Sequence, residues 1–163
     1  AITALGLVGY FKENNFLFCF CRVPKPSTTP SPPGRRHPAE HQRHHALLQC
    51  PGLGLNGISG YRLRVNPAQK KLELLRNEVR VHAVDFEWNA EEWTYLMLQV
   101  RELPGLQWAV EGKAWPATQK VPETWTLKWK DAGAPLPGRA SVWGTPYSGK
   151  PIAVDDVQVW RID

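Results

Sequence analysis

The chain has 163 residues, which is the size of one domain and is long enough to bury a hydrophobic core. Its net charge of +5 does not indicate a nucleic-acid-binding surface, because residues 22–45 carry five basic residues against one acidic residue, while the remainder carries 15 against 14. The excess charge therefore belongs to one proline-rich segment, which is typical of a solvated loop. No apolar run is long enough for a transmembrane helix, and residues 1–11 lack the basic start and the cleavage pattern of a signal peptide.

Eight tryptophans and many β-branched residues, interrupted by glycine and proline, indicate an all-β protein. No window has the periodicity of a long amphipathic helix. The chain begins with alanine, and its first residues already have the pattern of a strand. We therefore expect a fragment of a longer polypeptide, cut near the start of a domain.

The first expected element is a hairpin, with strands at Thr3–Phe11 and Phe16–Arg22 joined by a polar turn. Cys19 and Cys21 are two apart on one strand, so they share a face and do not readily form a disulfide. Together with the distant Cys50, they are expected to act as small core residues.

Residues 23–57 differ in kind, because they are rich in proline, histidine and arginine and have almost no β pattern. They predict an insert or a disordered loop within the domain. His41 and His45 have the spacing of a metal-binding helix face, but no paired cysteine motif accompanies them, so a solvated loop is favoured over a zinc site.

From residue 60 onward the period-two pattern returns. The densest part is Val79–Lys113, where the strands Trp93–Arg101 and Leu106–Glu111 are predicted to form a hairpin about Pro104-Gly105. Trp93–Arg101 is apolar on both faces, which predicts a strand inside a two-layer structure. A turn is expected at Glu111–Lys113.

About ten strands are expected in all, at the spacing of a sandwich or jelly roll. Turns at Asn66–Gln69 and Asn77 and loops at 135–138 and 145–151 are expected between the remaining strands. These strands are expected at residues 61–66, 71–74, 79–84, 125–130, 139–143 and 152–162.

Several stretches together resemble the concanavalin A-like, laminin G-like jelly-roll modules of bacterial extracytoplasmic proteins. They are GLVGYFKENNFLFCF, YRLRV, KLELLR, WTYLMLQV, VEGK and AVDDVQVW, with Glu111 where the family usually has aspartate. The resemblance covers residues 3–22 and 60–162, and is closest to keto-disaccharide-hydrolase-like domains, often found beside a β-propeller. It implies an antiparallel two-sheet jelly roll and an extracytoplasmic location, whereas such modules serve as carbohydrate binders, enzymes or structural appendages.

Glucanases of this fold resemble one another in an E-x-D-x-E strand whose carboxylates share one face, as a retaining mechanism requires. The corresponding positions here are Ala83, Asp85 and Glu87, so the first carboxylate, the would-be nucleophile, is missing. This argues against glucanase chemistry, and no catalytic residue is predicted.

Asp155 and Asp156 open the last expected strand, where related modules use an acidic residue to bind a structural calcium ion or to bond the first strand's backbone. Adjacent residues point to opposite faces, so at most one of them points inward. A hydrogen-bonded strand-end aspartate is favoured, and Asp155 and Asp156 are kept as calcium candidates.

Aromatic residues in or beside loops are the binding candidates, because sugars stack their C–H faces on flat rings while nearby polar groups read the hydroxyls. The predicted ligand-binding residues are Trp88, Trp115, Arg139, Trp143 and Tyr147. The competing interpretation is that these rings fill the core or close the ends of the sandwich.

The sequence therefore favours a non-catalytic carbohydrate-binding or domain-scaffolding module of a larger protein. Its expected partners are a glycan and a neighbouring domain of the same polypeptide, with no nucleic acid and no cofactor beyond a calcium ion. Two alternatives remain: a glycoside hydrolase of the keto-disaccharide type, which requires two or more carboxylates or histidines in one pocket, and a purely structural module that packs on a β-propeller through a large apolar patch.

Overall fold

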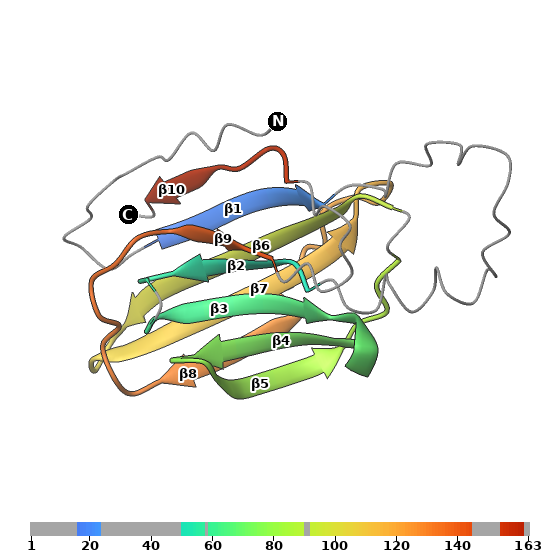
Figure 1. The fold of residues 1–163 in the computed structure, drawn as a ribbon. Helices are drawn as coiled ribbons and strands as arrows, with labels where there is room; N and C mark the ends of the chain where they lie inside the picture. The colour runs from blue at the N-terminus through green and yellow to red at the C-terminus, as the bar shows by residue number, and fades with distance from the viewer. Residues whose placement is uncertain (1–15, 24–49, 58, 90–91, 145–153, 162–163) are drawn as a thin grey trace, which may run out of the picture.

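The computed structural model describes residues 16–23, 50–57, 59–89, 92–144 and 154–161, with the backbone alone for residues 16–23. These residues form two five-stranded antiparallel sheets (Figure 1). The strands are β1 (Phe16–Val23), β2 (Gly52–Leu55), β3 (Tyr61–Asn66), β4 (Lys71–Arg76), β5 (Val79–Asp85), β6 (Thr94–Leu103), β7 (Gln107–Pro116), β8 (Leu127–Asp131), β9 (Ser141–Trp143) and β10 (Val159–Arg161).

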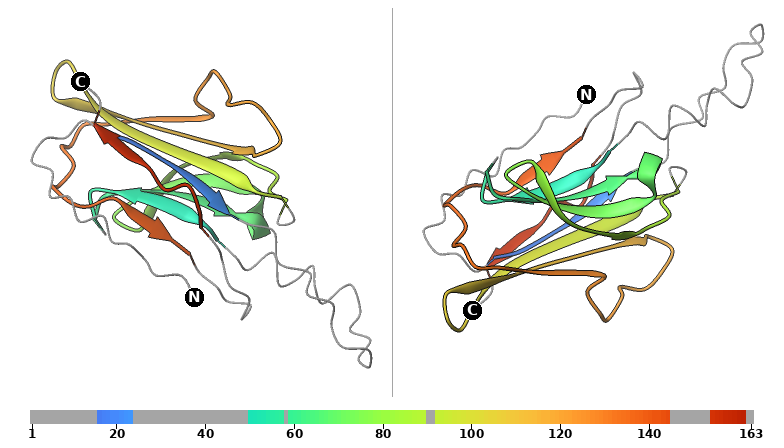
Figure 2. Two further views of the ribbon diagram at one scale, coloured as in Figure 1. Left: turned by 90° about the horizontal axis from the view of Figure 1, so that it is seen from above. Right: turned by 90° about the horizontal axis from the view of Figure 1, so that it is seen from below.

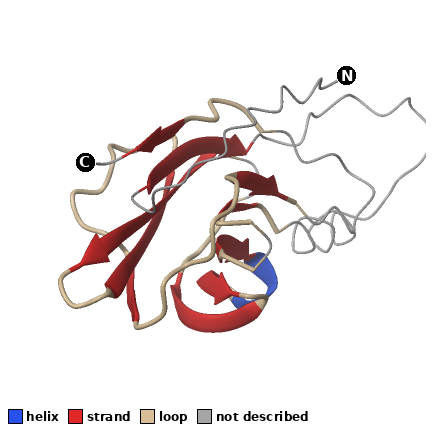
Figure 3. Ribbon diagram, turned by 90° about the vertical axis from the view of Figure 1, so that its left-hand side faces the viewer, coloured by secondary structure: helices blue, strands red, loops and turns tan. Residues whose placement is uncertain are grey.

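The first sheet has the order β10-β1-β6-β7-β8 and the second has the order β5-β4-β3-β2-β9. Seen from above and from below, the two sheets lie face to face as two layers (Figure 2), and the view along the layers shows the same separation (Figure 3). The predicted all-β architecture with two antiparallel sheets is therefore confirmed. In the described part of the chain, no helix is long and apolar enough to span a bilayer.

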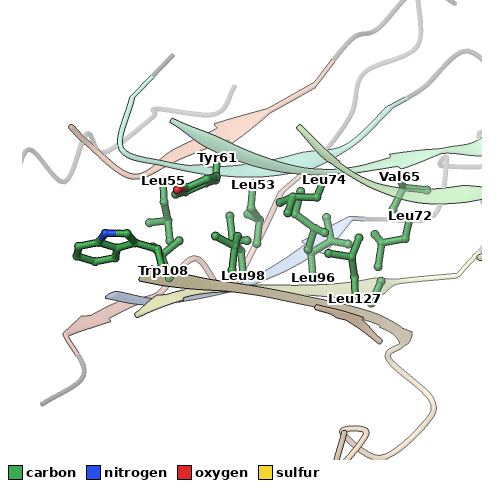
Figure 4. Packing of buried hydrophobic residues seen from close by; sticks show 14 residues of the cluster. Leu53, Leu55, Tyr61, Val65, Leu72, Leu74, Leu96, Leu98, Trp108 and Leu127 are labelled. Atoms are coloured by element: carbon green, nitrogen blue, oxygen red, sulfur yellow. The ribbon is translucent and has the colours of Figure 1, made fainter. Parts of the chain in front are cut away.

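The core lies between the sheets and is built from alternate residues of each strand (Figure 4). Leu63 and Leu74 of the second sheet meet Leu96 and Leu98 of the first, and all four are fully buried. Trp108 joins the same cluster, as Figure 4 shows. Burial of this kind stabilises each large aliphatic side chain by about 1.5–3 kcal/mol.

The hairpin β6–β7 is the longest pairing, and it turns at Pro104–Leu106 as the sequence predicts. Gly105 takes a positive φ of 82° in this turn, which glycine adopts without strain. The turn predicted at Glu111–Lys113 is wrong, because β7 continues through these residues to Pro116. Gly112 serves packing instead: an added Cβ would lie 2.6 Å from Leu63 Cδ1.

The meander β3–β4–β5 follows its predicted turns closely. Asn66 caps the short 3₁₀ helix η1 (Pro67–Gln69), since its side-chain oxygen accepts a hydrogen bond from the Gln69 N–H at 3.3 Å. Asn77 and Glu78 take positive φ values in the tight turn between β4 and β5. The sequence predicts both turns from their asparagines.

The predicted insert extends too far at its carboxyl end. Gly52–Leu55 form β2, which pairs with β3 on one side and with the edge strand β9 on the other. Leu53 and Leu55 are buried in the core. Cys50, just before β2, is half-buried and is a free cysteine. Residues 24–49 of the insert, with its histidines, lie outside the described residues, as does the strand expected at Thr3–Phe11.

The later strands are shorter than expected. The strand predicted at 125–130 is β8, and that predicted at 139–143 is β9. In the last predicted strand, Val159–Arg161 form β10 and pair with β1. The first and last described strands therefore lie side by side in one sheet.

Candidate functional site

A groove of about 720 Å³ lies beside the outer face of the first sheet, away from the core. Its walls come from three parts of the chain: the strands β6 and β7, the loop that connects β7 to β8, and the segment that leads into β10. The lining residues are Tyr95, Trp115, Gln119, Lys120, Val121, Asp156 and Gln158. Two of them, Trp115 and Asp156, are residues that the sequence singles out.

Tyr95 and Trp115 form the aromatic part of the groove. They are directly opposite each other on β6 and β7, and their ring centroids are 5.5 Å apart with the planes tilted by 33°. Both point away from the core, because the adjacent residues on their strands, Leu96 on β6 and Ala114 on β7, point into it. Trp115 is only 2 % exposed and packs beside Tyr95, and the half-buried Tyr95 offers more ring surface to a ligand.

The β7–β8 loop (residues 117–126) stands out from the first sheet on the side away from the second, as both views in Figure 2 show. The Ala117 N–H donates to the Trp93 carbonyl at 2.7 Å, and the Gln119 N–H donates to the Pro116 carbonyl at 3.0 Å. Lys113 of β7 donates from Nζ to the Pro122 carbonyl at 2.7 Å. The loop is therefore bonded to the sheet that it borders.

Lys113 is buried on this outer face, with 7 % of its surface exposed. Its ammonium lies 4.9 Å from the ring centroid of Trp125 and 5.6 Å from that of Trp115. Such distances allow cation–π attraction to both indoles. Burial lowers the pKa of Lys113 below that of an ordinary lysine, because a buried ammonium loses its hydration.

The groove combines charged and neutral polar groups. Lys120 and Asp156, both exposed, bring one positive and one negative charge, while Gln119 and Gln158 bring amides that donate and accept hydrogen bonds. Asp156 takes a positive φ of 55°, and its N–H donates to Asp155 Oδ1 at 2.9 Å. This bond is local to the pair, so the structural role predicted for Asp155 and Asp156 stays a prediction.

The calcium hypothesis finds little support in the described residues. Asp155 and Asp156 are both exposed, and one carboxylate oxygen is already bonded to the backbone. Calcium takes six to eight oxygen ligands. Over the residues that the structure describes, no group of three or more His, Cys, Asp and Glu side chains is arranged to hold a metal ion. Calcium binding at Asp155 and Asp156 therefore stays a prediction from the sequence.

The other predicted binding residues that the structure describes are not part of the groove lining. Trp88 is half-buried and packs against the core, and its Nε1 donates to Thr94 Oγ1 at 3.1 Å. Arg139 is exposed, and its backbone carbonyl accepts from the Gly57 N–H at 3.0 Å. Tyr147 lies outside the described residues. Trp88 thus packs as the competing interpretation expects.

Trp143 belongs to the second sheet, on β9. Its Nε1 donates to Ser141 Oγ at 2.7 Å, and the Arg62 guanidinium lies 3.7 Å from its ring centroid. The indole fits where Gly54 of β2 has no side chain, since an added Cβ there would come 2.6 Å from Trp143 Nε1. Trp143 and the groove are therefore separate features on different sheets.

The two carboxylates of the tested E-x-D-x-E pattern form surface ion pairs. Asp85 pairs with Lys71 at 2.6 Å and Glu87 with Lys70 at 3.0 Å, and both carboxylates are more than four-fifths exposed. Neither lines the groove, where Asp156 is the one carboxylate among the described lining residues.

Sequence reasoning missed Tyr95, Gln119, Lys120, Val121 and Gln158. Tyr95 carried a partial signal: a hairpin centred on Gly105 places residue 95 opposite residue 115, whereas the two-residue turn predicted at Pro104-Gly105 would place it opposite residue 114. The turn expected at Glu111–Lys113 ended β7 too early for that pairing. The remaining residues lie on loops, whose position the period-two pattern does not define.

A second, smaller cavity of about 320 Å³ lies at one end of the sandwich. Its lining residues are Ser59, Gly60, Tyr61, Arg76, Asn77, Pro135 and Leu136. Arg76 is already paired with the buried Asp131, at 2.6 Å from NH1 to Oδ1. This cavity therefore borders an internal ion pair, and the charge of Arg76 is already balanced by Asp131.

Comparison with known protein families, with curated proteins and with solved structures finds no match to this chain.

Proposed function

We propose that this chain is a non-catalytic carbohydrate-binding module whose ligand lies in the groove beside Tyr95. The observation that carries the proposal is the composition of that groove, where an aromatic pair meets two amides, one lysine and one carboxylate. Binding sites for small polar ligands combine apolar walls with a few convergent polar groups in this way. Tyr95 offers a ring for sugar C–H groups, and the surrounding groups bond hydroxyls.

The charge balance of the groove favours a neutral glycan. Lys120 and Asp156 carry opposite charges, so the lining has no net formal charge to select an acidic or a basic sugar. Lys113, close by, is engaged with the Pro122 carbonyl and two indole rings. Gln119 and Gln158 serve as donors and acceptors for hydroxyl groups without a charge requirement.

The hydrolase alternative has weaker support. Glycosidases of the usual type need two carboxyl groups that flank the scissile bond, and the described groove lining holds one, Asp156. The nearest matches to a catalytic sequence pattern, Asp85 and Glu87, are paired with surface lysines.

The resemblance in sequence supplies the wider setting of the proposal. The two antiparallel sheets and the pairing of the first described strand with the last are compatible with a concanavalin A-like jelly roll. Members of that class are modules of larger bacterial extracytoplasmic proteins. We therefore propose the same setting here, with a neighbouring domain in the same polypeptide.

The test is a glycan array followed by calorimetry on the best neutral ligand. Tyr95→Ala and Asp156→Ala should each weaken binding about tenfold or more, because each removes a groove contact. Asp85→Ala, which removes an exposed carboxylate outside the groove, serves as the matched control and should bind like the wild type. No glycan bound by the folded wild-type protein would refute the proposal and favour a scaffolding role.

A further inference from the structure

The β7–β8 loop supplies Gln119, Lys120 and Val121, three of the seven residues that line the groove. Its first residues are bonded to the sheet through the Ala117 and Gln119 N–H groups. Beyond the groove residues, Lys113 holds the loop at the Pro122 carbonyl. Gln119 therefore lies at the first attachment, Lys120 and Val121 lie between it and Pro122, and Lys113 provides the later attachment.

Lys113 contacts both the β7–β8 loop and the aromatic pair of the groove. Its ammonium lies near the Trp125 ring on the loop and near the Trp115 ring in the groove, and it donates a hydrogen bond to the loop backbone. A buried ammonium is costly unless it has such partners. The retained cation therefore joins the loop to the aromatic pair and is not an incidental surface lysine.

We propose that Lys113 is a positioning residue of the groove, which holds the β7–β8 loop against Trp115 so that Gln119, Lys120 and Val121 form a preformed wall. A preformed wall spares the ligand the entropic cost of ordering the loop. The inference rests on the proposed function only where it concerns ligand affinity. The position of the loop itself is a separate, ligand-independent property.

Amide hydrogen exchange on the ligand-free protein tests whether Lys113 holds the β7–β8 loop in position. Lys113→Met keeps the aliphatic stem and removes the cation and the donor, so the hydrogen-bonded amides of Ala117 and Gln119 should exchange about tenfold faster while β6 and β7 stay protected. Lys113→Arg, which retains a cation and donors, should restore part of the protection. Lys128→Met removes an exposed lysine opposite Glu111 on the next strand and should behave like the wild type.

Unchanged exchange of the loop in Lys113→Met would overturn the inference, and so would a uniform loss of protection across the whole sheet, which indicates a general role in stability. Affinity for the glycan identified on the array should also fall in Lys113→Met, by about threefold to tenfold. If the wild type binds no glycan, the proposed function fails, whereas the exchange result still decides the role of Lys113.

Discussion

The hydroxyl of Tyr61 on β3 donates to Asp131 Oδ2 on β8 at 2.7 Å, and this hydrogen bond joins the two sheets through the interior. The other oxygen of Asp131 accepts from Arg76 NH1 at 2.6 Å and from the Gly133 N–H at 3.0 Å. Asp131 is 5 % exposed, so its charge is satisfied by groups from both layers. Burial, together with the bond to Asp131, raises the pKa of the Tyr61 hydroxyl well above its usual value.

Tyr61→Phe should therefore lower the free energy of unfolding by about 1.5–3 kcal/mol, the range for a hydrogen bond to a charged group. The measurement is denaturant unfolding at neutral pH. A double-mutant cycle with Asp131→Asn isolates the interaction between the two residues. Additive losses in the cycle would show that the bond does not couple the sheets.

Glu73 is fully buried on the outer side of β4 and accepts hydrogen bonds from three neighbours: Arg64 at 2.6 Å, Arg80 at 3.0 Å and Asn66 at 3.2 Å. Burial alone would raise the pKa of Glu73, but the bonds from Arg64 and Arg80, with that from Asn66, lower it below the usual value. The folded state therefore holds the ionised form more strongly than the unfolded state does.

Because the folded pKa is lowered, the stabilisation from Glu73 is complete above its unfolded pKa, about 4.3, and is lost as the pH falls through the folded value. Glu73→Gln should cost about 1.5–3 kcal/mol at pH 7 and much less at the acidic end. Thermal unfolding of both proteins from pH 7 to pH 3 is the measurement. A constant difference between the two curves over that range would contradict this account.

Gly112 sits in the middle of β7, opposite Leu98 and against Leu63 of the other sheet. An alanine would place its Cβ 2.6 Å from Leu63 Cδ1, and Leu63 is fully buried and cannot move away easily. Gly112→Ala should destabilise the protein by about 1–3 kcal/mol through overpacking. The unfolding free energy from urea titration checks this value.

Gly133→Ala provides a contrast for Gly112→Ala. Its added Cβ would approach Arg76 NH2 at 2.8 Å, the far end of a partly exposed side chain that can shift. The loss of stability should be the smaller of the two. A larger loss at residue 133 would mean that the Arg76 pair with Asp131 is more rigid than the Gly112 contact with Leu63.

Period-two patterning from Tyr61 onward was sufficient to predict the two-layer β structure and the β6–β7 hairpin, because burial on one face fixes which residues alternate. The turns at Asn66–Gln69 and Asn77 were also predictable, since asparagine caps and left-handed residues have a local cause. β2 was missed because its two leucines alternate with Gly52 and Gly54, and glycine is depleted in strands. On the paired strand β3, Arg64 lies opposite Gly52 and Arg62 lies opposite Gly54. The Trp143 ring packs against Gly54.

The candidate site was predictable only in part. Trp115 and Asp156 stood out by residue type, but their meeting in one groove depends on the position of the β7–β8 loop and of the segment before β10. The loop makes tertiary contacts such as that of Lys113 Nζ with the Pro122 carbonyl, which no local pattern encodes. The pairing of Tyr95 with Trp115 required the true length of β7.

The most direct test of glycan binding in the groove is an NMR titration of the isotope-labelled protein with the best ligand from the array. The account predicts shifts in the amides of Gln119, Lys120, Val121, Asp156 and Gln158, with the Trp115 indole signal moving and the Trp143 indole signal unchanged. Shifts gathered instead around Trp143 and Arg62 on the second sheet would contradict it and move the site to the opposite layer.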